Sequence, residues 1–308
     1  MKILLILLSI LAVILVGIFF LWLSIERAVL PRKATIAFWN LSDLPLIKKC
    51  EGYIYAARSV WYLKPASWAW FMRRYRSRES GETYHGKVIS KKDASKLINL
   101  QQEVFLTDLE HVVTYSIARD IVLQKPMPSL AVIDCPCRQQ KKDYCKPLDV
   151  CLVVGEPFVS FAVEHQPGKA RRIEVAEALQ ILDAEEKRGH VHTAWFKDAM
   201  HNRFYTICNC CSCCCLGMQS YFRGVPRLVH SGYRPELDPS ECVNCGNCIQ
   251  ICPFKALGES DEVPDIDEGR CMGCGLCSSH CPKQAINMVL APERGIPLDI
   301  EKLMISEE

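Results

Sequence analysis

The longest uninterrupted apolar stretch lies at the start of the chain. Residues Ile3 to Ile25 contain no charged side chain. These 23 residues would form a helix of about 35 Å, which is enough to cross a hydrocarbon core of about 30 Å. A cleaved signal peptide is the alternative, but its apolar part should be only about 7–15 residues long and should end in small residues. The sequence Ser24-Ile25-Glu26-Arg27 offers no such cleavage site, so we predict a retained transmembrane anchor over residues 1–26.

Apolar residues at helical spacing predict two further helices. One covers 173–182 and continues to Lys187-Arg188-Gly189, a basic last turn with a glycine stop. The other lies around 92–109. His190 and His192 follow the first of these helices and are open to a role as metal ligand or proton relay. Because the sequence indicates no metal or proton-transfer partner for either histidine, we expect both to be turn residues without such a role.

Aromatic residues next to a basic cluster mark residues 61–78. Four aromatic side chains are followed directly by four arginines: Trp61, Trp68, Trp70, Phe71, and then Arg73, Arg74, Arg76, Arg78. The apolar part is too short to span a membrane, and its composition suits the headgroup layer. The alternative is an ordinary amphipathic packing helix with a solvated basic end. Proximity to the predicted anchor favours docking at the membrane surface.

The charge is unevenly distributed along the chain. Residues 1–100 hold 16 Lys and Arg against 6 Asp and Glu, 101–231 hold 15 of each, and 232–308 hold 6 against 14. The basic front suits anionic lipid, and the flanking Arg27, Arg32 and Lys33 predict a single-pass protein of the inner (cytoplasmic) membrane, with its body in the cytoplasm. The overall net charge of +2 argues against a nucleic-acid binder. With 49% apolar residues, the chain can form a substantial core.

The most specific pattern is a repeat near the C-terminus. Of the 19 cysteines in the chain, eight form two runs of C-x-x-C-x-x-C-x-x-x-C-P. The runs are offset by 29 residues, and flanking positions repeat at the same offset, which indicates an internal duplication. The first run holds Cys242, Cys245, Cys248, Cys252 and Pro253, and the second holds Cys271, Cys274, Cys277, Cys281 and Pro282.

This spacing predicts two [4Fe–4S] clusters with crossed ligation. Three closely spaced cysteines wrap one cubane, and the fourth cysteine of each run ligates the other cluster. Cluster one would be held by Cys242, Cys245, Cys248 and Cys281, and cluster two by Cys271, Cys274, Cys277 and Cys252. Residues 232–292 resemble the bacterial-type dicluster ferredoxin, which implies one-electron transfer at low potential. Zinc and disulfides are the alternatives, but zinc sites usually use two spaced cysteine pairs, and disulfides need an oxidising compartment.

Ten more cysteines lie in two central runs. The remaining cysteine, Cys50, is isolated, and we expect it to be a buried or unpaired thiol. The first run holds Cys135, Cys137, Cys145 and Cys151, and the second holds Cys208, Cys210, Cys211, Cys213, Cys214 and Cys215. Free thiols at this density are an oxidation liability unless a metal holds them. We expect one or two further [4Fe–4S] clusters here, ligated within or between the runs. Zinc and a dithiol or disulfide redox site remain alternatives.

The CPCR segment, the CNCC-x-CCC segment and the C-terminal repeat together resemble uncharacterised iron–sulfur proteins of anaerobic microbes. We predict an α+β fold, with an N-terminal transmembrane helix, a mixed cysteine-rich central domain and a C-terminal ferredoxin-like dicluster domain. The expected boundaries are 1–26 for the anchor, 27–85 for a juxtamembrane segment, 86–231 for the central domain, 232–292 for the ferredoxin domain and 293–308 for an acidic tail.

No nucleotide-binding glycine fingerprint, Walker A loop or haem-attachment motif is present in the sequence. The first hypothesis is therefore a membrane-anchored electron carrier, or an electron-transfer subunit of an oxidoreductase, with protein redox partners as donor and acceptor. The acidic residues of the ferredoxin unit could form the docking face for a basic partner. A redox enzyme with its chemistry at the central cysteines is the second hypothesis. A sensor or assembly factor with a labile cluster is the third.

Overall fold

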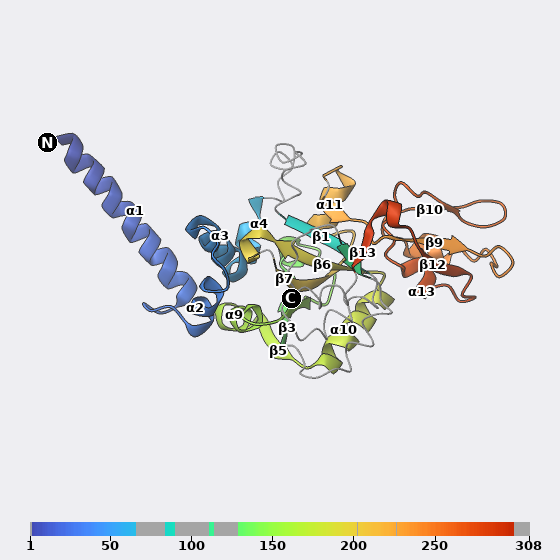
Figure 1. Ribbon diagram of the computed structural model, residues 1–308, viewed down its shortest axis with the longest axis horizontal. Coiled ribbons are helices and arrows are strands. Elements are labelled where there is room, and N and C mark those ends of the chain that lie inside the picture. The colour runs from blue at the N-terminus through green and yellow to red at the C-terminus, as the bar shows by residue number, and fades with distance from the viewer. Residues whose placement is uncertain are drawn as a thin grey trace, which may run out of the picture.

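The computed structural model describes residues 2–65, 84–89, 111–113, 129–201, 203–225 and 227–298. The expected helix around 92–109 and most of the aromatic and basic segment lie outside these described residues. Helices and sheets are mixed along the chain, which confirms the predicted α+β fold. Helix α1 projects from one end of the molecule, and the C-terminal cysteine-repeat unit lies at the other (Figure 1).

Four helices begin the chain: α1 (Lys2–Glu26), α2 (Lys33–Trp39), α3 (Leu46–Ala57) and α4 (Ser59–Leu63). Residues Ile6–Glu26 of α1 are long and apolar enough to cross a membrane, by length and composition. Large apolar side chains from Ile6 to Leu21 are exposed along this helix. Among the side chains of α1 that the structure describes, those of Ile25 and Glu26 in its last turn are buried against the body.

A buried carboxylate joins the end of α1 to the body. Glu26 is fully buried, and its Oε1 accepts hydrogen bonds from Thr35 Oγ1 at 2.5 Å and Tyr53 OH at 2.9 Å. The Nε2 atom of His165 lies 3.3 Å from the same oxygen. Trp22 stacks on the ring of Tyr53, with centroids 5.7 Å apart. Because a buried carboxylate needs these partners, the network fixes the direction in which α1 leaves the body.

A seven-stranded sheet forms the centre of the molecule, in the order β5-β3-β4-β7-β6-β1-β8. Neighbouring strands run antiparallel, apart from the parallel edge pair of β1 and β8. The strands are β1 (Tyr84–Ile89), β3 (Leu130–Asp134), β4 (Asp149–Val154), β5 (Ala170–Ile173), β6 (Val191–Lys197), β7 (Phe204–Cys210) and β8 (Leu228–Val229). Short 3-10 turns follow β3 (Arg138–Gln140) and β6 (Asp198–Met200).

The two faces of this sheet are covered by different helices. Side chains alternate between faces along a strand. Leu152 of β4 faces the core shared with α10 (Val175–Lys187), whereas Val153 faces the core shared with α9 (Phe158–His165) and the N-terminal helices. Helix α10 confirms the helix expected from 173 to 187. Gly189 follows it with a φ of +74°, as the predicted glycine stop requires.

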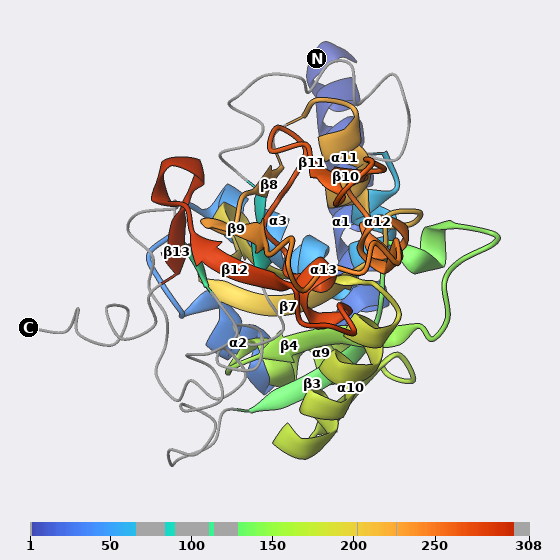
Figure 2. The same cartoon turned by 90° about the vertical axis from the view of Figure 1, so that its right-hand side faces the viewer.

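The C-terminal unit is built from two short helices and paired strands (Figure 2). Its elements are β9 (Tyr233–Leu237), α12 (Asn247–Ile251), β10 (Leu257–Gly258), β11 (Asp265–Ile266), α13 (Leu276–Ser279) and β12 (Ile286–Leu290). A short 3-10 turn (Pro292–Arg294) leads to β13 (Ile296–Leu298), which pairs in parallel with β2 (His111–Val113). Helix α11 (Leu216–Phe222) lies between β7 and β8 in the sequence. The expected domain boundaries remain predictions.

Candidate metal centres

Strand pairing explains how cysteines from different runs meet. Strand β9 pairs with β12, so Cys281, just before β12, is brought close to Cys242, just after β9. Strand β10 pairs with β11 in the same way, which brings Cys252 close to Cys271. Each pair joins the last cysteine of one run to the first cysteine of the other.

Two cavities result, each surrounded by four cysteines. One has a volume of about 350 Å³ and is lined by Cys242, Cys245, Cys248 and Cys281. The other has a volume of about 290 Å³ and is lined by Cys252, Cys271, Cys274 and Cys277. This grouping is the one that crossed ligation requires. We call them the first and the second ferredoxin cavity.

The internal duplication is visible in local geometry. Gly246 and Gly275 precede α12 and α13 with φ angles of +73° and +86°, a left-handed conformation that favours glycine. The backbone N–H groups of Ala256 and Ala285 each donate to a cysteine Sγ four residues earlier, at 3.3 Å. Hydrogen bonds to cysteine sulfur are among the features that set cluster potential.

The thiols around these cavities are suited to metal rather than to free thiolate. Burial raises the pKa of Cys248, Cys271 and Cys274, and it raises the pKa of Cys277 to about 12. Free thiols here would therefore stay protonated at neutral pH. A metal deprotonates the thiols that coordinate it, so the donor set and the enclosed spaces fit iron–sulfur clusters.

In the central domain, the ten cysteines separate into two groups. The inner cysteines are Cys135, Cys137, Cys151, Cys208, Cys210 and Cys215, and they all line one cavity of about 940 Å³, a volume that includes its solvent-exposed part. The outer cysteines are Cys145, Cys211, Cys213 and Cys214, whose sulfur atoms all lie within 4.8 Å of one another. Both groups combine cysteines from the two runs. Cys211 belongs to the outer group and also lines the cavity.

Three of the inner cysteines come from the adjacent strands β4 and β7, and the other three come from loops next to the sheet. Cys151 lies on β4, Cys208 and Cys210 lie on β7, and Cys215 caps the start of α11. The Sγ atoms of Cys215 and Cys210 are 3.0 Å apart. Side-chain hydrogen bonds from Cys137 and Cys151 lower the pKa of Cys135 well below its usual value. Apolar side chains complete the cavity wall, among them Tyr55, Phe158, Phe161, Trp195 and Tyr205.

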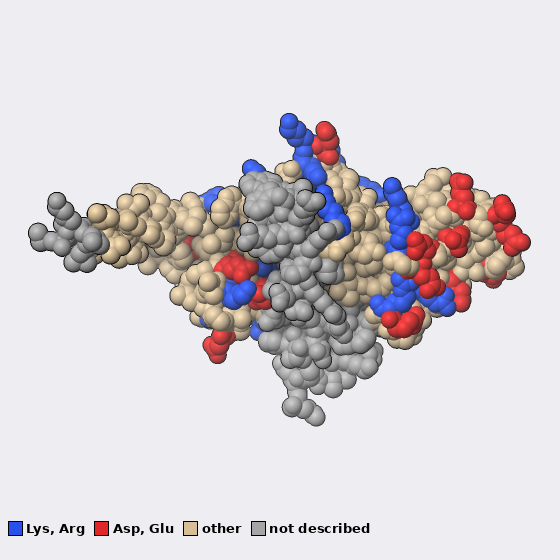
Figure 3. Space-filling view, turned by 90° about the horizontal axis from the view of Figure 1, so that it is seen from above, with Lys and Arg blue, Asp and Glu red and all other residues tan. Residues whose placement is uncertain are grey.

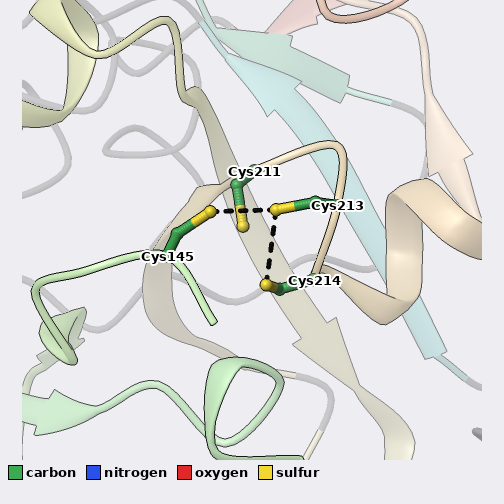
Figure 4. A group of neighbouring side chains, drawn as sticks. All are labelled: Cys145, Cys211, Cys213 and Cys214. Atoms are coloured by element: carbon green, nitrogen blue, oxygen red, sulfur yellow. Dashed lines mark hydrogen bonds between the residues drawn. The ribbon is translucent and has the colours of Figure 1, made fainter. Parts of the chain in front are cut away.

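The outer cysteines lie beside this cavity, where two loops meet (Figure 4). The Sγ atoms of Cys145 and Cys213 are 2.9 Å apart, and those of Cys213 and Cys214 are 3.4 Å apart. Cys211 and Cys214 are buried, whereas Cys213 is exposed. Burial raises the pKa of Cys211 to about 12. Partial loss of hydration, together with hydrogen bonds to Cys145 and Cys214, raises the pKa of Cys213 to about 12.

A buried ion pair beside the central cysteines was not anticipated from the sequence. Arg138, which directly follows Cys137, is fully buried and donates to Glu185 of α10 at 2.6 Å. His190 Nδ1 lies 2.7 Å from the same carboxylate oxygen. Burial acts to raise the pKa of Glu185, but the hydrogen bonds from His190 and Arg138 hold it below its usual value. The position of Arg138 directly after Cys137 in the CPCR segment was the sequence feature that could have indicated this ion pair.

The remaining predicted residues have simpler surroundings. His190 belongs to the ion-pair network, and the buried His192 has its Nδ1 2.5 Å from Asn209 Oδ1, so each histidine has a polar partner. Cys50 is half-buried on α3 and lines none of the three cysteine cavities.

The central cavity and the second ferredoxin cavity share one hydrophobic core. Cys210 and Cys215 belong to this core together with Phe254 and Cys271, and Cys252 packs against it. Helix α11 begins directly after Cys215, and at its other end Tyr221 packs edge-on against Phe254, with centroids 5.6 Å apart. Seven helical residues rise about 10 Å, which is the length of α11.

Comparison with known families identifies the C-terminal unit. Residues 236–288 match the family model of the 4Fe–4S dicluster domain. The match confirms the predicted ferredoxin-type unit and supports the binding of [4Fe–4S] clusters by this part of the chain. A comparison of the chain with curated proteins found no match.

Crossed ligation makes a specific prediction for single substitutions. Cys252→Ser should alter the electron paramagnetic resonance (EPR) signal of the second ferredoxin cavity, although Cys252 belongs to the first run. Its spectrum should resemble that of Cys274→Ser, and the spectrum of Cys281→Ser should resemble that of Cys245→Ser. A Cys252→Ser spectrum that matched Cys245→Ser would contradict crossed ligation.

Proposed function

We propose that this protein is a membrane-anchored iron–sulfur electron-transfer protein, in which two ferredoxin clusters exchange electrons with a third cluster in the central domain. The observation that carries this proposal is the shared core between the central cavity and the second ferredoxin cavity. Clusters in the three cavities would form a row, and electrons would pass between neighbours. Such a chain needs no nucleotide site, in agreement with the absence of nucleotide-binding motifs from the sequence.

The cysteine donors and the volume of the central cavity fit an iron–sulfur cluster, as those of the ferredoxin cavities do. Its wall supplies six inner thiols, and a cubane needs four. The buried guanidinium of Arg138 lies close to this wall and would stabilise the negative charge of a thiolate-bound cluster. The inner cysteines are therefore the proposed ligands. We propose Cys137 as one of the four, because its thiol hydrogen-bonds to both Cys135 and Cys215.

The volume of the central cavity favours a second candidate function. At about 940 Å³ it is far larger than the ferredoxin cavities of about 350 and 290 Å³. A cubane would leave part of this volume free, lined mainly by aromatic and aliphatic side chains and open in part to solvent. This arrangement suits a redox enzyme that brings a small apolar molecule next to the cluster, with electrons supplied by the ferredoxin unit.

The ends of the molecule suit different surroundings. Helix α1 would cross the inner membrane at one end, with the body on the cytoplasmic side. At the opposite end, acidic side chains gather over the ferredoxin unit (Figure 3). They include Glu259, Asp261, Glu262, Asp265, Asp267 and Glu268, all of them exposed. A basic redox protein would be steered to this acidic surface.

Metal analysis of protein purified without oxygen tests the number of clusters. We expect about 12 iron and 12 sulfide per chain, because three cubanes each hold four of both. Cys137→Ser should reduce both counts towards 8, whereas Cys50→Ser should leave them unchanged. About 8 of each in the wild type would contradict a third cluster.

Carbon monoxide tests the second candidate function, because it is a small apolar ligand of reduced iron. If the central cluster has accessible space, carbon monoxide should change the EPR signal that Cys137→Ser removes. The two ferredoxin signals serve as the internal control and should not change. A central signal that stays the same under carbon monoxide would count against the enzyme hypothesis and favour the electron carrier.

Deletion of residues 2–20 tests the anchor without disturbing the Glu26 network. The shortened protein should move from the membrane fraction to the soluble fraction and keep its iron content. Deletion of 2–26 is the matched comparison: it removes the acceptor shared by Thr35, Tyr53 and His165, at a cost of about 1–3 kcal/mol for each unpaired buried group. Its thermal unfolding temperature should therefore be lower. If the first variant stayed with the membrane, α1 would not be the main anchor.

A further inference from the structure

We propose that the four outer cysteines bind a single zinc ion, separate from the iron–sulfur clusters. The outer group is Cys145, Cys211, Cys213 and Cys214, and it is the tightest group of metal-ligating side chains among the described residues. Each cysteine supplies one thiolate, which gives the Cys₄ ligand set of structural zinc sites.

The spacing of the sulfur atoms favours one ion over a cubane. In a tetrahedral site with Zn–S bonds of about 2.3 Å, neighbouring sulfur atoms lie about 3.8 Å apart. All four outer sulfur atoms lie within 4.8 Å of one another, and two of the separations are 2.9 Å and 3.4 Å. Zinc binding would lengthen these two separations by roughly 0.4 to 0.9 Å.

The ferredoxin cysteines provide a comparison inside the same chain. Their thiolates would bind four different irons of a cubane, and they surround cavities of about 350 and 290 Å³. In neither ferredoxin set do the four sulfur atoms all lie within 4.8 Å of one another, as they do in the outer group. In Figure 4 the outer side chains point towards one another. The outer group therefore has the dimensions of a mononuclear centre.

The position of the outer group suits a structural ion. Cys211, Cys213 and Cys214 lie in the loop between β7 and α11, and this loop is flanked by the inner residues Cys210 and Cys215. Cys145 comes from the loop between β3 and β4, which also carries Cys135 and Cys137. An ion at this point would tie the two loops together and hold inner cysteines of both in place. All four ligands come from the chain, so no coordination position remains for a substrate.

The ligand set also favours zinc over iron. Four thiolates in tetrahedral geometry suit zinc or iron, and for a given site the affinity order places Zn²⁺ above Fe²⁺. A mononuclear site contains no inorganic sulfide to favour iron. Zinc has no redox chemistry, so such an ion would shape the cluster cavity without taking part in electron transfer.

Zinc X-ray absorption on the intact, anaerobically purified protein tests this proposal directly. We expect about one zinc per chain, with four sulfur ligands at about 2.3 Å. Zinc with nitrogen or oxygen ligands, or no zinc together with one iron in a sulfur-only site, would overturn the proposal.

Two matched variants separate the zinc site from the clusters. Cys213→Ser changes an exposed outer cysteine and should lose the zinc while the ferredoxin EPR signals persist. Cys137→Ser changes an inner cysteine and should lose iron while the zinc remains. A loss of about four irons from Cys213→Ser, with no zinc in the wild type, would identify the outer site as a cubane instead. The zinc measurements do not depend on the iron count, so failure of one proposal leaves the other standing.

Discussion

The fold collects many thiols into a few buried spaces, and the positions of its strands and loops follow from this. Buried thiolates repel one another and lose their hydration, so burial raises the pKa of several cysteines in these groups, among them Cys211, Cys271 and Cys277. A positively charged metal centre removes that conflict because it binds the deprotonated form. The fold brings the cysteines together through paired strands in the ferredoxin unit and through adjacent strands and loops in the central domain.

The arrangement of these spaces explains how the two halves of the protein are joined. The central cavity and the second ferredoxin cavity share a core, and α11 connects them from Cys215 to the aromatic contact with Phe254. The two halves are therefore packed together as one body rather than joined by a loose linker. Ser231 strengthens this junction, because its Oγ donates to the carbonyl oxygen of Gly273 at 2.7 Å. Fixed separation between centres is what an electron relay requires.

At the other end of the molecule, the buried carboxylate of Glu26 joins α1 firmly to the body. Its carboxylate is shared by groups from α2, α3 and α9, so the apolar helix cannot reorient without breaking several buried hydrogen bonds. This junction holds α1 in a fixed direction relative to the body. The acidic surface of the ferredoxin unit lies at the end of the molecule opposite α1 (Figure 3).

The parts of this protein whose chemistry depends on local spacing could be predicted from the sequence. The C-x-x-C-x-x-C-x-x-x-C-P repeat predicted the ferredoxin unit, the apolar run predicted α1, and the periodicity with its glycine stop predicted α10. In each case the residues that make up the pattern lie close together in the sequence. The division of the ten central cysteines could not be predicted in this way, because each group combines residues from two runs more than 50 positions apart, which the folded chain brings together. The tertiary structure also revealed the Glu26 network and the Arg138–Glu185 pair, since the partners of a buried charge come from distant elements and leave no local pattern.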